Sequence, residues 1–280
     1  MARIAHLSDI HFGAHDPAVV AGAEAWLVEQ RPDLVVISGD FTQRARVAQY
    51  REAAAFLDRL EAAGLRTLGV PGNHDVPLYD VLVRFVRPLG RYRRYIDDDL
   101  CPWFESEWLA VLGINTARSL TIKDGRINHE QMALIRKRFR DVQDDRTRIL
   151  VTHHPLFAMP IGEEGALTKA VGRHESALEA VCEAGIHLLL AGHFHRSFSG
   201  SAREMVKKAG PALVIQAGTA TSIRLRAGEA QRFNLIHARR NDEVDLQMIE
   251  WDGTAFRGRG HARFTYDGKR WHSRPTVAAA

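Results

Sequence analysis

The chain contains very little cysteine. Its 280 residues include two cysteines, Cys101 and Cys182, which lie far apart and form no Cys-x-x-Cys pair. Two such residues provide neither a disulfide framework nor a thiolate metal site. We therefore expect a protein of a reducing compartment, and the predicted location is the cytoplasm.

Long hydrophobic runs are also absent from the sequence. No stretch approaches the roughly 20 apolar residues that cross a bilayer, although 45% of the residues are hydrophobic. The segment Met1 to Arg3 leads directly into the strand-like run Ile4 to Leu7, so no signal peptide is expected. This composition suits one domain with a full core, spanning residues 1–280.

A strong charge of one sign is missing over most of the chain. The net charge is +4, and residues 221–280 hold 11 Lys and Arg against 7 Asp and Glu, which accounts for the whole excess. A basic C-terminal part suits an anionic substrate or peripheral contact with a membrane, and it equally suits a solvated face of edge strands. No nucleic-acid module is recognisable, so a nucleic acid is not an expected partner.

Strand-like and helical patterns alternate through the first two thirds of the chain. The strand-like runs are Ile4 to Leu7, Leu34 to Ile37, Thr67 to Val70, Leu109 to Ile114, Ile149 to Val151 and His187 to Ala191. The helical patterns are Ala18 to Gln30, Val47 to Ala63, His129 to Phe139 and Ser176 to Glu183. This alternation predicts an α/β fold with a largely parallel sheet.

The pattern changes after residue 210. Strand-like runs now follow one another at Leu213 to Ala217, Arg232 to His237, Glu243 to Ile249 and Arg263 to Tyr266. Asp-Gly pairs at 252–253 and 267–268 are typical of the turns between such strands. Residues 211–273 are therefore predicted to form a second, antiparallel sheet, stacked face to face on the first with helices outside.

Two segments depart from this regular scheme. Residues 76–104 form an insertion in which Arg84, Arg87, Arg91 and Arg94 have the spacing of one helix face. Pro88 and Gly90 interrupt that helix. The arginines and nearby tyrosines either bind a nucleotide or pack and solvate an ordinary helix. The Gly-rich segment 158–173 is either a mobile lid or a surface connection, and the sequence leaves both choices open.

Short polar clusters recur where predicted strands end. They are Asp9 with His11, Asp40, Asn73-His74-Asp75, His153, and His193 with His195. Strand ends of an α/β sheet open onto one edge, so these distant residues should converge there. Seven oxygen and nitrogen donors at one rim can hold two divalent metals. A carboxylate can bridge two cations, and we assign that shared position to Asp40.

The clusters resemble the signature of the calcineurin-like metallophosphoesterase superfamily: D-x-H, G-D, G-N-H-[D/E], a lone H and G-H-x-H, in that order. The matching blocks are Asp9-Ile10-His11, Gly39-Asp40, Gly72-Asn73-His74-Asp75, His153 and Gly192-His193-Phe194-His195. They cover residues 9–195, about two thirds of the chain. The resemblance implies a four-layer α/β/β/α sandwich of two stacked mixed sheets flanked by helices.

The resemblance also implies roles for individual residues. One metal would be held by Asp9, His11, Asp40 and His195, and the other by Asp40, Asn73, His153 and His193. His74 would contact the phosphate or the leaving group together with Asn73, and Asp75 would orient His74. His154, beside His153, would be structural. Arg44 falls where a related branch places a phosphate-binding arginine; it is a candidate for a substrate contact, and a solvated position at the start of a helix is the open alternative.

The expected cofactors are two transition metal ions, divalent or of mixed valence, and the donor set suits Mn, Fe, Zn or Co. In the implied reaction a hydroxide bridging the metals attacks phosphorus, assisted by His74. Gln43 stands where purple acid phosphatases carry a tyrosine, which argues against a coloured iron site. Asp75, in place of glutamate, argues against the Ser/Thr protein phosphatases.

The layout is most similar to the bacterial class III cyclic-nucleotide phosphodiesterase branch, partly through the stretch Gly218 to Ser222 that leads to Arg224 and Arg226. We therefore expect hydrolysis of a small phosphodiester, with a 3',5'-cyclic nucleotide as one candidate. Open alternatives are a lipid-linked pyrophosphate or glycerophosphodiester hydrolase, a phosphomonoesterase, a nuclease, and a non-catalytic scaffold of the same fold. Assembly into a homo-oligomer is also left open.

Overall fold

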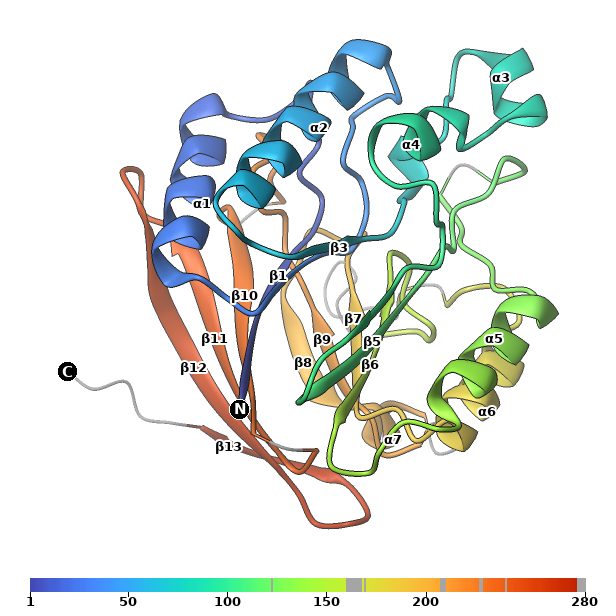
Figure 1. Ribbon diagram of the computed structural model, residues 1–280, viewed down its shortest axis with the longest axis vertical. Helices are drawn as coiled ribbons and strands as arrows, with labels where there is room; N and C mark the ends of the chain where they lie inside the picture. Colours follow the sequence, from blue (N-terminus) through green and yellow to red (C-terminus); the bar gives the residue numbers. More distant parts are fainter. Residues whose placement is uncertain are drawn as a thin grey trace.

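The computed structural model describes residues 1–121, 123–159, 168, 170–206, 210–226, 229–239 and 241–275. Its described strands form two sheets that stack face to face (Figure 1). The strand order of the first sheet is β13-β12-β11-β10-β1-β2-β3, and that of the second is β4-β5-β6-β7-β9-β8. Both sheets contain parallel and antiparallel neighbours and are therefore mixed.

The strand bounds are as follows. The first sheet contains β1 (Ala2–Leu7), β2 (Leu34–Ile37), β3 (Thr67–Gly69), β10 (Arg232–Arg239), β11 (Glu243–Trp251), β12 (Phe256–Tyr266) and β13 (Trp271–Pro275). The second contains β4 (Trp103–Glu105), β5 (Leu109–Ile114), β6 (Thr147–Thr152), β7 (Leu188–Ala191), β8 (Phe198–Ser201) and β9 (Leu213–Gln216).

Helices cover the outer face of each sheet. The first sheet carries α1 (Pro17–Gln30), α2 (Val47–Ala62) and α4 (Gly90–Tyr95), and the second carries α5 (His129–Phe139) and α6 (His174–Glu183) (Figure 1). The remaining helices are short: η1 (Asn73–Asp75), α3 (Val81–Val86) and α7 (Ala202–Met205). The predicted four-layer α/β/β/α sandwich is therefore confirmed.

The central strands are apolar on both faces because each lies between two layers, whereas β12 at the margin of the first sheet is largely exposed. In β1, Ile4 packs between the sheets, whereas Ala5 and Leu7 pack against the helices. In β5, Val111 faces the other sheet and Leu112 faces the helices. Successive side chains of a strand point to opposite faces, so a run buried on both sides must be continuously hydrophobic.

The predicted division of the strands between the sheets is wrong. The late strands β10 to β13 do not form a sheet of their own, because β10 pairs antiparallel with β1 and extends the first sheet. The strand β9 pairs parallel with β7 in the second sheet. The reason is that β1 is buried and needs a backbone partner on each edge; β2 satisfies one edge and β10 the other.

The insertion at 76–104 contains two short helices, as the break at Pro88 and Gly90 predicts. Its arginines consequently do not share one helix face. Arg84 is buried and bonds backbone carbonyls, whereas Arg91 pairs with Asp80. The proposed lid over 158–173 falls mainly on residues 160–167 and 169, which lie outside the described residues.

The basic residues of the C-terminal strands are largely paired. Arg232 contacts Glu229 and Glu250, while the Arg263 guanidinium lies 2.7 Å from Asp245. Of the readings left open by the sequence, a solvated strand face fits these pairs. Across the described ranges, no helix has both the length and the apolar character needed to cross a bilayer.

The layer between the sheets should dominate stability. Leu190 in β7 is 1% exposed, so Leu190→Ala should lower the free energy of unfolding by about 2–5 kcal/mol through lost burial and a residual cavity. The same substitution at Leu120, which is 79% exposed, should change it by about 0.5 kcal/mol or less. Urea unfolding measures both values; equal midpoints for the two variants would contradict the assigned core.

Candidate metal centre

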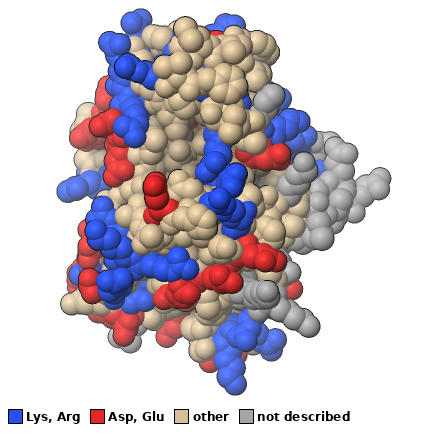
Figure 2. Space-filling view, turned by 90° about the vertical axis from the view of Figure 1, so that its right-hand side faces the viewer, with Lys and Arg blue, Asp and Glu red and all other residues tan. Residues whose placement is uncertain are grey.

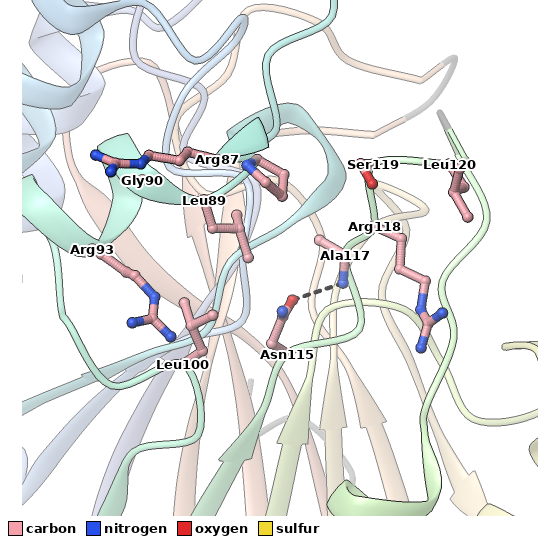
Figure 3. Close-up of a pocket in the computed structure, with 11 residues that line it drawn as sticks. Arg87, Leu89, Gly90, Arg93, Leu100, Asn115, Ala117, Arg118, Ser119 and Leu120 are labelled. Atoms are coloured by element: carbon pink, nitrogen blue, oxygen red, sulfur yellow. Dashed lines mark hydrogen bonds between the residues drawn. The ribbon is translucent and has the colours of Figure 1, made fainter. Parts of the chain in front are cut away.

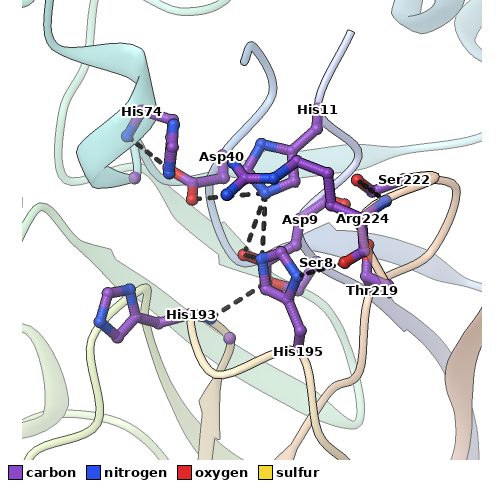
Figure 4. Close-up of polar contacts among 12 residues, drawn as sticks. Ser8, Asp9, His11, Asp40, His74, His193, His195, Thr219, Ser222 and Arg224 are labelled. Carbon is purple, nitrogen blue, oxygen red and sulfur yellow. Dashed lines mark hydrogen bonds and ion pairs between the residues drawn. The ribbon is translucent and has the colours of Figure 1, made fainter. Parts of the chain in front are cut away.

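The polar clusters come together at one rim of the sandwich (Figure 4). Three follow strands of the first sheet: Asp9 after β1, Asp40 after β2 and Asn73 after β3. The two remaining clusters follow strands of the second sheet: His153 comes after β6, and the pair His193 and His195 comes after β7. The predicted convergence at strand ends therefore draws on both sheets at once.

The backbone at this rim adopts an uncommon conformation. Five residues of the clusters have a positive φ, between 53° and 83°. They are Asp9, His11, Asp40, His193 and His195. A positive φ is rare for residues with a side chain and is found where the surrounding structure enforces it, often at functional sites. The strand ends turn sharply here and aim consecutive side chains into one space.

Glycines leave room for these side chains. A methyl group at Gly72 would collide with the side chain and the backbone nitrogen of Asp40. One at Gly39, where φ is +95°, would collide with the His153 ring. Glycine is thus required next to Asp40 and Asn73 by the close approach of other ligands, which explains its place in the sequence blocks.

The first group of donors surrounds His11. Nε2 of His11 lies 3.1 Å from Nε2 of His195, 3.6 Å from Oδ1 of Asp9 and 3.8 Å from Oδ2 of Asp40. Nε2 of His195 lies 3.1 Å from Oδ1 of Asp9. These four side chains are the ones that the sequence assigned to one metal.

The second group lies beside it. Nε2 of His153 is 3.4 Å from Oδ2 of Asp40 and 3.1 Å from Oδ1 of Asn73. Nδ1 of His193 is 3.0 Å from the same Asn73 oxygen. Oδ2 of Asp40 thus faces both groups, while its Oδ1 accepts a hydrogen bond from the backbone N–H of His74 at 2.8 Å. That arrangement suits the bridging role predicted for Asp40.

The hydrogen bonds of the histidines fix which ring nitrogens can bind a metal ion. Nδ1 of His153 donates to the carbonyl of Ser38 at 2.7 Å, and Nδ1 of His195 donates to the carbonyl of Arg224 at 3.2 Å. The Nε2 lone pairs therefore point inward. Oδ1 of Asp9 is buried and accepts no hydrogen bond from the described residues. Lone pairs converge from several sides, which fits a binuclear metal site.

The electrostatics favour a positive charge at the centre. Burial alone would raise the pKa of Asp40, but His153, His74 and His11 outweigh burial and lower it. For His153 the directions are reversed: burial alone would lower its pKa, but the Asp40 carboxylate outweighs burial and raises the pKa to about 9. Buried carboxylates of this kind need a compensating cation, and metal ions supply more charge than protons do.

His154 is a further histidine within reach. Together with His153 and His193 it forms a cluster that could hold an ion. Its Nδ1 lies 2.8 Å from Oγ1 of Thr116, and its Nε2 is buried without a hydrogen-bond partner among the described residues. The contacts of His153 with both Asp40 and Asn73 favour His153 as the ligand, and the bond to Thr116 gives His154 a supporting place.

His74 lies beside the first donor group, with its ring 4.9 Å from that of His11. Its Nδ1 donates to the carbonyl of Gln43 at 2.8 Å. Because a carbonyl can only accept, Nδ1 carries the proton in this contact, and the side-chain amide nitrogen of Gln43 lies 3.3 Å from the same atom. Among the described residues, none forms a hydrogen bond with Nε2, which leaves that atom available for chemistry. The Gln43 carbonyl was missed by the sequence reasoning, since every residue type carries one.

The prediction that Asp75 orients His74 needs correction. The Asp75 carboxylate accepts hydrogen bonds from the backbone N–H groups of Phe41, Thr42 and Gly72 and from the Thr42 hydroxyl. Burial and the charge of Asp40 nevertheless raise its pKa to about 6. Asp75 ties the loop after β2 to the loop after β3 and is a positioning residue, not a catalytic one.

A cavity of about 270 Å³ adjoins the metal centre. Its lining consists of the polar residues Gln43, Asn73 and His74, the side chains Val76, Leu78 and Tyr79, and the cations Arg44, Arg84, Lys123 and Arg224. Nη1 of Arg44 bonds the Tyr79 hydroxyl at 2.6 Å. The sequence reasoning named Arg44, but it missed Tyr79 and Lys123 as lining residues.

The stretch 218–222, noted in the sequence, supports the loop after β1. The hydroxyl of Thr219 donates to the carbonyl of Asp9 at 2.7 Å, and that of Thr221 donates to the carbonyl of Ile10 at 2.8 Å. Ser8 donates its hydroxyl proton to Oδ2 of Asp9 at 2.6 Å, which leaves Oδ1 facing the centre. These bonds fix the orientation of the first ligand cluster.

A four-layer sandwich whose rim carries clusters of Asp, Asn and His that fit two metals defines a metal-dependent phosphoesterase. Residues 2–197 match the family of calcineurin-like phosphoesterases, which is most of the chain. The chain therefore belongs to that family.

Three relatives are similar to this part of the chain. A "Probable cyclic nucleotide phosphodiesterase" of Synechococcus sp. is 23% identical over 70% of this chain and 74% of its own length. The "Serine/threonine-protein phosphatase CPPED1" of Bos taurus is 29% identical over 68% and 62%. The "Glycerophosphodiester phosphodiesterase GpdQ" of Enterobacter lignolyticus is 28% identical over 57% and 58%.

A solved structure supports the fold. A dimetal phosphatase from Danio rerio superposes with a TM-score of 0.65, covering 95% of this chain and 99% of its own, at 13% sequence identity. At that identity the likeness establishes the fold alone.

The ligand assignment predicts different outcomes for the adjacent histidines. His153→Ala should reduce the metal content of protein reloaded with Mn or Zn from about two ions per chain to about one, because Nε2 of His153 faces Asp40 and Asn73. His154→Gln, which can still bond Thr116, should retain about two. Elemental analysis of desalted protein gives both values. Loss of an ion in the His154 variant alone would reverse the assignment.

Proposed function

We propose that the protein hydrolyses a small phosphodiester at this rim. The observation that carries the proposal is the position of His74 between the metal centre and the cavity, with Nε2 free. A diester has a second organic group on its phosphate. The apolar wall of Val76, Leu78 and Tyr79 offers that group a place, while Arg44 and Arg224 complement the phosphate charge.

The chain's own residues divide the work. Asp9, His11, Asp40, Asn73, His153, His193 and His195 would hold two divalent metals. When bound, such metals supply Lewis-acid activation of water and of the phosphoryl group. When Nε2 of His74 has also taken up a proton from water, it donates that proton to the leaving oxygen and returns to the free base, or it stabilises negative charge there while protonated. Nδ1 stays fixed by the Gln43 carbonyl throughout, so the ring keeps its orientation.

A nucleoside 3',5'-cyclic phosphate is our candidate within this class. The tyrosines first considered for stacking a base pack inward instead: Tyr92 lies against Phe41, and Tyr95 stacks on Tyr50. Tyr79 takes their place in the proposal, because it is exposed and lines the cavity. The Synechococcus relative bears a matching name.

A phosphomonoester is the second candidate. Arg44, Arg84, Lys123 and Arg224 bring four positive charges to one small cavity, more than a singly charged diester requires. A doubly charged monoester would gain more from them. The Bos taurus relative, whose name is that of a phosphatase, is in keeping with this reading.

Chromogenic substrates separate the two candidates. Metal-stripped protein reloaded with Mn or Zn should cleave bis(p-nitrophenyl) phosphate with a higher kcat/KM than p-nitrophenyl phosphate, since the apolar wall accommodates the second ring. Asp40→Ala should lose turnover of both, because Oδ2 of Asp40 faces both donor groups. A higher kcat/KM for the monoester would refute the diester proposal and favour the phosphatase.

The role of His74 is tested by substitution. His74→Ala should lower kcat for the diester by about 10²- to 10⁴-fold, the usual contribution of a general acid or base. Its metal content should not change, because the His74 backbone N–H to Asp40 remains. Gln43→Ala is the comparison variant: it removes a cavity-lining amide that lies 3.3 Å from Nδ1 of His74 but keeps the orienting carbonyl, so its loss of kcat should be much smaller than that of His74→Ala. Equal losses in both variants would contradict the assigned role.

A further inference from the structure

The helix α3 exposes its apolar residues and buries its arginine, whereas a surface helix usually does the opposite. Its apolar residues are exposed: Val81 by 61%, Leu82 by 74%, Phe85 by 57% and Val86 by 66%. Its arginine, Arg84, is 6% exposed. Residues four apart in a helix share a face, so Val81 with Phe85 and Leu82 with Val86 form one broad apolar surface. Nothing in the rest of the described chain covers it.

Arg84 fixes this surface in place. Its guanidinium donates to the carbonyls of Pro77, Ser119 and Thr121 at 2.7 to 2.9 Å. The last two carbonyls flank Leu120, which is 79% exposed. The four apolar residues of α3 and Leu120 therefore form a single held projection, which we call the apolar knob. Helix α3 lies at the upper right of Figure 1, and the top of Figure 2, which views the molecule from that side, shows a broad area without Lys, Arg, Asp or Glu.

The charge around the apolar knob is mainly positive. Residues 76–95 contain five arginines and one aspartate, Asp80, which pairs with Arg91. Arg87, Arg93 and Arg94 are exposed, and Arg93 lies 3.5 Å from the exposed Asp98. The aspartates at 97–99 follow the far end of α4, whereas α3 precedes its near end. An apolar surface bordered by arginine suits a partner that is apolar inside and anionic outside.

A cavity of about 650 Å³ lies beside the apolar knob and shares Leu120 with it. Leu89, Leu100 and Ala117 line it, and the side chains of Arg87, Arg93 and Arg118 stand apart around it (Figure 3). Arginines that converge would indicate one bound phosphate. Arginines spread around an apolar hollow suit several separate anionic groups, such as the headgroups of a lipid surface.

We propose that the apolar knob and the adjoining arginines dock the protein on a membrane surface rich in anionic lipid. A second copy of the chain is the weaker occupant, because a symmetric contact through this surface would bring the same arginines together. Leu78 and Tyr79, which line the cavity at the metal centre, directly precede α3. Docking would thus bring the mouth of that cavity near the headgroups, in contrast to the C-terminal strands first considered for membrane contact.

Vesicle sedimentation tests the proposal without any need for turnover. The wild-type protein should sediment with vesicles of phosphatidylcholine and phosphatidylglycerol, less so with phosphatidylcholine alone, and less at high salt. The double variant Leu82→Ser, Phe85→Ser should lower the partition coefficient roughly tenfold or more, since both side chains would enter the interface. Both positions are exposed and lie outside the metal centre, so turnover of bis(p-nitrophenyl) phosphate should not change.

The matched control is Trp108→Ser. Trp108 is an exposed apolar residue just before β5, at the opposite end of the sheet from the metal centre, and its loss should leave sedimentation unchanged. Absence of wild-type sedimentation, or equal sedimentation of the wild type and the double variant, would overturn the proposal. A wild-type dimer in light scattering that the double variant dissociates would also overturn it and assign the apolar knob to self-association.

Discussion

The buried carboxylate of Asp40 is the interaction on which the rest of the rim depends. One of its oxygens holds the backbone of His74, and the other faces His11 and His153 from the two donor groups. A carboxylate out of contact with water must be compensated, and the ring of histidines around it does so only in part. The loops, glycines and hydroxyls nearby all serve to keep this one charge in place and its neighbours aimed at it.

Local sequence patterns predicted the parts of the structure that depend on local chemistry. Clusters of Asp and His at the ends of apolar runs predicted that residues from Asp9 to His195 would meet at one rim, because a parallel strand fixes where its last residue points. The four layers followed from the resemblance to the metallophosphoesterases, and the alternation of strands and helices agreed with it. The pairing of β10 with β1 did not follow, since it joins residues more than 200 positions apart and many strands of suitable composition compete for that edge.

Other features of the site escaped prediction for a different reason. The group that orients His74 is the backbone carbonyl of Gln43. Every residue type has such a carbonyl, so the sequence does not show which one forms this bond. Asp75 stands next to His74 in the sequence, yet the turn of η1 sends its carboxylate to the loop after β2. The sequence suggests that Arg84 is an exposed charge. In the structure its guanidinium is buried by hydrogen bonds to three backbone carbonyls, and its apolar neighbours in α3 are exposed instead.

Each donor group of the rim takes members from both sheets. The group around His11 joins residues after β1 and β2 to His195 after β7, and the group around Asn73 joins it to His153 after β6. Metal bound here would link two halves that otherwise meet through a largely apolar layer and a few hydrogen bonds, such as that of His153 to the carbonyl of Ser38. A ligand that binds the folded chain alone adds RT ln(1 + [L]/Kd) to its stability. The free energy of unfolding thus depends on the free metal concentration around the protein. At low metal concentration the contacts between the two sheets at the rim would be the first to weaken.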